Sequence, residues 1–250
     1  MPTTIILTRD QLLKENYNGA IRERKILGFP QEKSPLQSYS SIFYWSYVMS
    51  DYGCMITEHP HIGFEILSYV LKGGFDTYDK ERDQWIRLGE GDIGIIQAGK
   101  GVRHSEKIYP RSEILQIWFD PDFNQFRKID PVLNQYASNS FPVNNNSKGR
   151  NIRLMKGKNA PVKLNSKDIS IQMQEMEAGF HKITCPEDTV ISGYVIDGFI
   201  ELDNRTLGKH DFFKIEEEQE VEIASLTNSK VFMITSPFKP EYAMYAAMHL

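Results

Sequence analysis

The sequence predicts an all-β protein in which one fold occurs twice. Strand-type segments dominate, long helical periodicity is scarce, and the strand–turn motifs of the first half recur in the second half. The chain has 250 residues, of which 40% are hydrophobic, so it is long enough to bury a sizeable core. We therefore expect closed or sandwiched β-sheets.

Aromatic and β-branched runs between turn residues mark the strands of the first half. The predicted strands are residues 41–49, 64–71, 84–88, 93–96 and 114–119. Residues 8–15 and 130–137 have weak helical spacing, so we expect one or two helical turns in each.

A repeat divides the chain. Residues 69–73 match 194–198, and residues 88–96 match 207–215, at nearly constant offsets. Between the copies, residues 131–150 are rich in polar turn formers. We predict an N-terminal domain at 1–130, a linker at 131–152 and a C-terminal domain with a tail at 153–250.

Charge and cysteine content exclude several classes of protein. The net charge of -4, from 33 acidic and 29 basic residues, argues against a broad nucleic-acid surface. No apolar run has the length of a membrane span. Cys54 and Cys185 are expected to be free thiols in a reducing compartment, which favours a cytoplasmic protein that does not bind membranes or nucleic acid.

Two short motifs carry the chemistry of the chain. His59 and His61 are two residues apart, as are His104 and Glu106, and such pairs lie on one face of a β-strand. If the two strands face each other across a barrel, three imidazoles and one carboxylate converge. This ligand set suits a divalent transition metal and leaves coordination positions for substrate or O2. A lone His-x-His is compatible with ordinary half-buried residues, but the second motif argues against that interpretation.

Other residues leave alternatives open. Glu65 lies on the same strand face as His59 and His61, so it competes with Glu106 as the carboxylate ligand. The second copy lacks both motifs, which predicts one metal ion per chain. The isolated residues His181, His210 and His249 are expected at the surface or in turns. The following aromatic residues are expected to pack in the core or at a barrel mouth: Phe43, Tyr44, Trp45 and Trp118.

Residues 59–65 (HPHIGFE), 98–106 (AGKGVRHSE) and 115–118 (LQIW) resemble the pirin family of the cupin superfamily. The resemblance implies a bicupin, with two cupin-type β-barrels (double-stranded β-helix, or jelly roll) in tandem and a metal-binding N-terminal barrel. It assigns the metal to His59, His61, His104 and Glu106. Glu65 then becomes a partner that orients an imidazole N–H, and Gln116 is a weaker candidate for a similar role.

The resemblance also implies an activity. Pirin-like proteins are associated with quercetin 2,3-dioxygenase activity, which implies Fe(II), O2 and a small aromatic substrate such as a flavonol. Mn, Co, Ni, Cu and Zn also suit these ligands. Glu106 is the candidate catalytic residue, able to take a proton from a substrate hydroxyl. The alternative is a non-catalytic metal-binding module that regulates or binds a protein partner.

Overall fold

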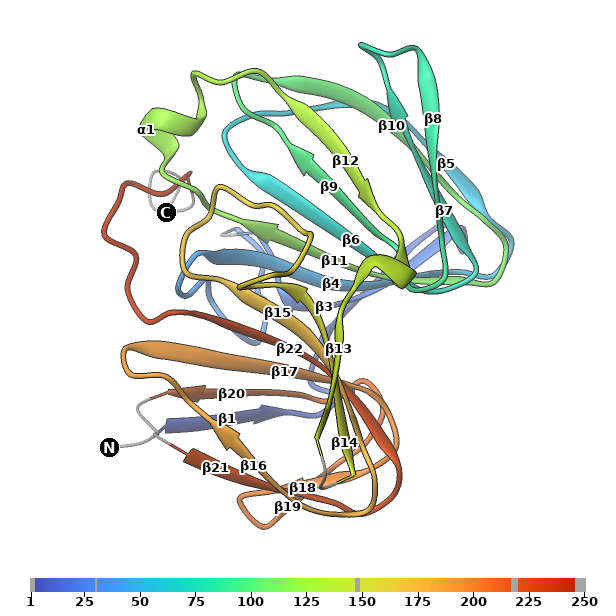
Figure 1. Cartoon of the computed structure of the whole chain (residues 1–250). Coiled ribbons are helices and arrows are strands. Elements are labelled where there is room, and N and C mark those ends of the chain that lie inside the picture. The colour runs from blue at the N-terminus through green and yellow to red at the C-terminus, as the bar shows by residue number, and fades with distance from the viewer. Residues whose placement is uncertain (1–2, 30, 147–148, 217–219, 246–250) are drawn as a thin grey trace. The chain divides into compact units, whose positions relative to one another are not determined.

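The structure is a computed structural model that describes residues 3–29, 31–146, 149–216 and 220–245. These residues form two compact units, both built of β-strands (Figure 1). The N-terminal barrel contains the described residues of 13–140, 164–167 and 241–250. The C-terminal barrel contains those of 1–12, 141–163 and 168–240. The predicted all-β fold class is confirmed.

Two antiparallel sheets form the N-terminal barrel. Its elements are β2 (Leu13–Tyr17), β3 (Ile21–Leu27), β4 (Ile42–Ser50), β5 (Cys54–His61), β6 (Glu65–Lys72), β7 (Gly74–Asp79), β8 (Gln84–Gly89), β9 (Ile93–Gln97), β10 (Val102–Ile108), β11 (Ser112–Phe119), α1 (Phe123–Phe126), β12 (Val132–Tyr136) and η1 (Ser138–Ser140). One sheet has the order β12-β9-β6-β11-β4-β3-β2, and the other has the order β5-β10-β7-β8. Every strand run predicted in this half coincides with an observed strand.

Two buried apolar clusters fill the interior of the N-terminal barrel, and the first is mainly aliphatic. Val70, Leu88 and Ile114 belong to a buried cluster that joins the two sheets. The other cluster is rich in aromatic residues, including Phe43 and Phe64. Because side chains alternate along a strand, β10 turns His104, Glu106 and Ile108 inward, towards this interior.

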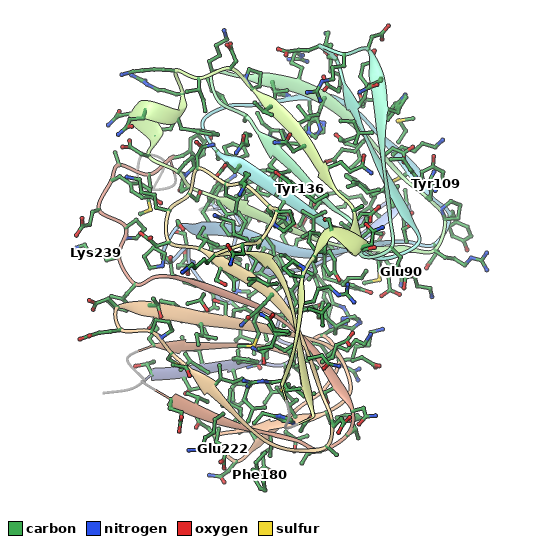
Figure 2. All side chains as sticks on the ribbon, viewed as in Figure 1. Glu90, Tyr109, Tyr136, Phe180, Glu222 and Lys239 are labelled. Carbon is green, nitrogen blue, oxygen red and sulfur yellow. The ribbon has the colours of Figure 1, made fainter. Side chains whose placement is uncertain are left out.

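The C-terminal barrel repeats the two-sheet arrangement. Its strands are β1 (Thr3–Leu7), β13 (Val143–Asn146), β14 (Arg150–Lys156), β15 (Ser170–Met176), β16 (Gly179–Thr184), β17 (Thr189–Asp197), β18 (Ile200–Leu202), β19 (Arg205–Leu207), β20 (Phe212–Glu216), β21 (Glu220–Ser225) and β22 (Ser229–Pro237). The sheets have the orders β1-β20-β17-β22-β15-β14-β13 and β16-β21-β18-β19. Buried apolar side chains such as Ile191, Phe213 and Met233 fill its interior, whereas Phe180 points outward from β16 (Figure 2).

The structure corrects several predicted boundaries. β1 pairs with β20, so the first residues belong to the C-terminal barrel rather than to a domain spanning 1–130. The predicted linker at 131–152 contains β12, β13 and the start of β14. β2 occupies part of the segment expected to be helical at 8–15, and β12 lies within 130–137. Neighbouring strands offered backbone partners that outweighed weak helical spacing.

Of the residues that the structure describes, no helix has the length and apolar character required to cross a bilayer.

Candidate metal centre

The two histidine motifs lie on neighbouring strands of one sheet. β5 and β10 are antiparallel partners, with His59 opposite His104 and His61 opposite Val102. The sequence argument placed the two strands on opposite walls of a barrel; direct pairing brings them together instead. The β5–β10 pairing shifts its register between His104 and Glu106, so Glu106 lies opposite Ile56.

The three imidazoles are in mutual contact. The ring centroids of His59 and His104 are 4.4 Å apart, those of His59 and His61 are 4.8 Å apart, and those of His61 and His104 are 5.0 Å apart. One nitrogen from each ring lies within 4.8 Å of the other two. Three nitrogens at this spacing can bind one transition-metal ion.

Hydrogen bonds fix the orientation of two of these rings. His104 Nδ1 and Thr77 Oγ1 are hydrogen-bonded at 3.0 Å. His59 Nδ1 donates to the carbonyl oxygen of Thr57 at 2.9 Å, which leaves the Nε2 lone pair of His59 available. His104 Nε2 is buried and has no hydrogen-bond partner. A buried nitrogen without a partner beside two further imidazoles fits a metal ligand, because coordination supplies the missing interaction.

Burial keeps two of the three histidines in the form that binds metal. Desolvation, followed by repulsion from His59, lowers the pKa of His61 to about 3. Desolvation and the neighbouring imidazoles lower the pKa of His104 to about 2. Both rings are therefore neutral at physiological pH, and no proton has to leave them before a metal ion binds.

Glu106 is buried on the same face of β10 as His104. Its carboxylate accepts a hydrogen bond from Gln116 Nε2 at 3.1 Å. Burial raises the pKa of Glu106 to about 7, although the hydrogen bond from Gln116 opposes this rise. Over the described ranges, the group of close ligand atoms consists of the three histidines and does not include Glu106. Gln116 is therefore hydrogen-bonded to Glu106 rather than to an imidazole, and Glu106 lies outside the group of three histidines.

Glu65 has a different environment from the one predicted. Its side chain is fully buried and accepts hydrogen bonds from Gln97 Nε2 at 2.9 Å, the amide of Asn165 at 2.7 Å, and both the amide and the hydroxyl of Ser166 at 2.9 and 2.7 Å. The carboxylate therefore binds the segment 164–167 to the barrel instead of orienting an imidazole. Sequence reasoning missed this role because Asn165 and Ser166 lie about a hundred residues away.

Thr77 takes the orienting role instead. It pairs with Glu106 where β7 meets β10, and it is buried. A threonine at an inward position of a barrel strand would have been the signal, but residues 74–79 were not recognised as a strand.

A large cavity opens beside His61. It has a volume of about 840 Å³, within the ~300–1,000 Å³ of small-molecule sites. His61 contacts Trp118 and Phe64, with centroids 5.2 and 5.3 Å apart, and these two rings stack on each other at 4.9 Å. Phe43 and Trp118 line the cavity, as barrel-mouth packing requires, whereas Trp45 is fully buried in the core.

The histidines of the C-terminal barrel have other environments. His181 is buried, and its Nε2 is hydrogen-bonded to the carbonyl oxygen of Glu177 at 2.8 Å, so its expected surface position is wrong. His210 occupies a turn with φ of 74° and is hydrogen-bonded to Tyr194. His249 lies outside the described residues. Cys54 and Cys185 are free thiols, as predicted.

Comparisons with known proteins show which families this chain resembles. Residues 31–119 match the pirin family model. The chain is 26% identical to a putative quercetin 2,3-dioxygenase of Zymomonas mobilis, over 72% of this chain and 76% of that protein. It is also 26% identical to the quercetin 2,3-dioxygenase of Escherichia coli, over 72% and 75% of the two chains. A nickel(II) complex of a bacterial pirin from Escherichia coli has a similar fold, with a TM-score of 0.79 at 20% identity over 94% of this chain and 99% of that chain.

Proposed function

Because this chain belongs to the pirin family, we propose that its N-terminal barrel binds one divalent transition metal ion, most favourably Fe(II), and oxidises a small aromatic substrate of the flavonol type with O2. The observation that carries the proposal is the group of three close imidazoles beside an aromatic cavity of about 840 Å³. His59, His61 and His104 would hold the metal, and Glu106 would either coordinate it or leave it to accept a proton. The histidine and carboxylate donors also suit Mn, Co, Ni, Cu and Zn.

The metal, when bound, supplies a Lewis acid that acidifies a substrate hydroxyl and the redox chemistry for O2. The protein supplies position and proton transfer. Trp118 and Phe64 line the cavity beside His61, and an aromatic substrate would pack against this wall. Burial of His104 shields one side of the site from water.

Glu106 is proposed to take the proton from the substrate hydroxyl. Its raised pKa of about 7 makes the carboxylate a better proton acceptor than an exposed glutamate and still leaves it substantially ionised at neutral pH. Gln116 donates to the same carboxylate and holds it in place before and after the transfer.

The test is turnover by iron-loaded protein. We expect O2 uptake and loss of the flavonol absorbance when quercetin is added in air. His61→Ala should abolish both, whereas His210→Asn, which removes an imidazole from the C-terminal barrel, should leave both unchanged. O2 and quercetin consumption by the unmodified protein that is no faster than by His61→Ala would refute the proposed enzymatic activity. It would favour the alternative of a metal-binding module without turnover.

Metal content is a separate test. Protein purified without added metal is expected to hold one equivalent, and His104→Ala should lose it. A second equivalent that survives His104→Ala would contradict the assignment to the N-terminal barrel.

A further inference from the structure

The cavity beside His61 is completed by a segment that is remote in sequence. Residues 241–245 belong to the N-terminal barrel, although the rest of that barrel is built mainly from residues 13–140. Figure 1 shows the end of the described chain beside α1. Tyr245 is among the residues that line the cavity.

Three hydrogen bonds hold this segment in place. The amide of Tyr245 donates to Asp120 Oδ1 at 2.8 Å, and the hydroxyl of Tyr242 donates to the carbonyl oxygen of Asp120 at 2.9 Å. The amide of Phe123 donates to the carbonyl oxygen of Ala243 at 2.9 Å. Asp120 is itself only 1% exposed, so the segment is bound to a rigid part of the barrel. Tyr245 therefore has a defined position in the wall.

The Tyr245 ring extends the aromatic wall away from the histidines. It contacts Phe64 at 5.3 Å, Phe43 at 5.8 Å and Phe123 at 6.0 Å between ring centroids. Phe64 contacts both His61 and Tyr245. A ligand that starts at His61 and lies along this wall passes Phe64 before it reaches Tyr245.

We propose that Tyr245 is a specificity-determining residue that selects ligands with two or more linked or fused aromatic rings. This inference rests on the proposed function for the position of the first ring. A one-ring ligand bound at the histidines contacts Phe64 and Trp118 and stops there. The second and third rings of a longer ligand reach Tyr245, which buries them and closes that part of the cavity.

Equilibrium binding tests the proposal without turnover. The probes are quercetin, which has three rings, and catechol, which has one; each is titrated under anaerobic conditions into iron-loaded protein. Tyr245→Ala should weaken quercetin binding by roughly tenfold or more, because an aromatic contact is lost, and leave catechol binding within about twofold. Tyr245→Phe keeps the ring and should bind both probes like the unmodified protein. Tyr52→Ala removes a tyrosine that is 83% exposed and serves as the matched control.

Metal titration of each variant checks that the histidine site is intact. Equal quercetin affinity in Tyr245→Ala and the unmodified protein would overturn the proposal, as would equal losses for both probes. Failure of the unmodified protein to bind quercetin would also overturn it, because the cavity would then not take a three-ring ligand. If quercetin binding depends on Tyr245 but no O2 is consumed, the proposal for Tyr245 is supported and the proposed dioxygenase activity is refuted. The two proposals can therefore fail separately.

Discussion

Replacement of Glu65 separates two roles for a buried carboxylate. The structure has Glu65 binding segment 164–167, whereas the sequence suggested that it orients an imidazole. Glu65→Ala leaves the buried amide and hydroxyl of Ser166 and the amide of Gln97 without their acceptor. Each such donor costs about 1–3 kcal/mol when it stays buried and unpaired. Partial entry of water reduces the sum, so we expect a loss of about 3–5 kcal/mol in the free energy of unfolding.

Urea unfolding followed by tryptophan fluorescence measures this loss. All three tryptophans, Trp45, Trp85 and Trp118, lie in the N-terminal barrel, so the signal reports the unit that contains Glu65. Exposed Glu81→Ala is the matched control and should change stability by less than about 0.5 kcal/mol. A Ni(II) titration of Glu65→Ala in native buffer should give the same affinity as the unmodified protein. An unchanged urea midpoint together with Ni(II) affinity at least tenfold weaker would refute the reasoning and restore the imidazole role.

Three further predictions concern the metal centre. Thr77→Val removes the hydrogen-bond partner of His104 Nδ1 and should weaken Ni(II) binding by about tenfold or more. The control Thr184→Val, in the C-terminal barrel, should leave the Ni(II) affinity unchanged. Equal Ni(II) affinities of Thr77→Val and the unmodified protein would contradict an orienting role for Thr77. The pKa values of His61 and His104 lie below their unfolded value near 6.5, so the unfolded chain binds protons first as the pH falls. The metal-free protein should therefore lose stability below about pH 6.5. Thermal melting from pH 7.5 to 5 measures this loss, and His104→Ala should flatten the profile. The pKa of Glu106 is raised from 4.5 to about 7, so its protonated form contributes stability that is present below pH 4.5 and lost as the pH rises through 7. Between pH 5 and pH 8, the free energy of unfolding of Glu106→Gln should therefore rise by up to about 3 kcal/mol relative to that of the unmodified metal-free protein. A difference that stays constant with pH would contradict the raised pKa.

Five strands of the N-terminal barrel were predictable, because aromatic and β-branched runs stand between clear turns; they are β4, β6, β8, β9 and β11. β6 and β11 are central strands buried on both faces, and their near-continuous apolar sequences show it. β2 and β12 were not predicted, because each lies at the edge of its sheet, where polar side chains dilute the strand pattern.

The histidine cluster was predictable for a local reason, since alternation along a strand already places His59 with His61 and His104 with Glu106. Which strands are neighbours is a property of the whole barrel, and this is why facing walls were expected where β5 and β10 are paired. Thr77, Glu65 and Tyr245 depend on contacts between remote segments. No spacing in the sequence indicates them.

The division of the chain between the two barrels has a consequence for biosynthesis. The first strand made, β1, has to wait for β20 before it gains its partner, about two hundred residues later. The wall around the ligand cavity gains Tyr245 only after nearly all of the C-terminal barrel has left the ribosome. A nascent or prematurely ended polypeptide that already has all three histidines would thus possess a metal site with an unfinished pocket.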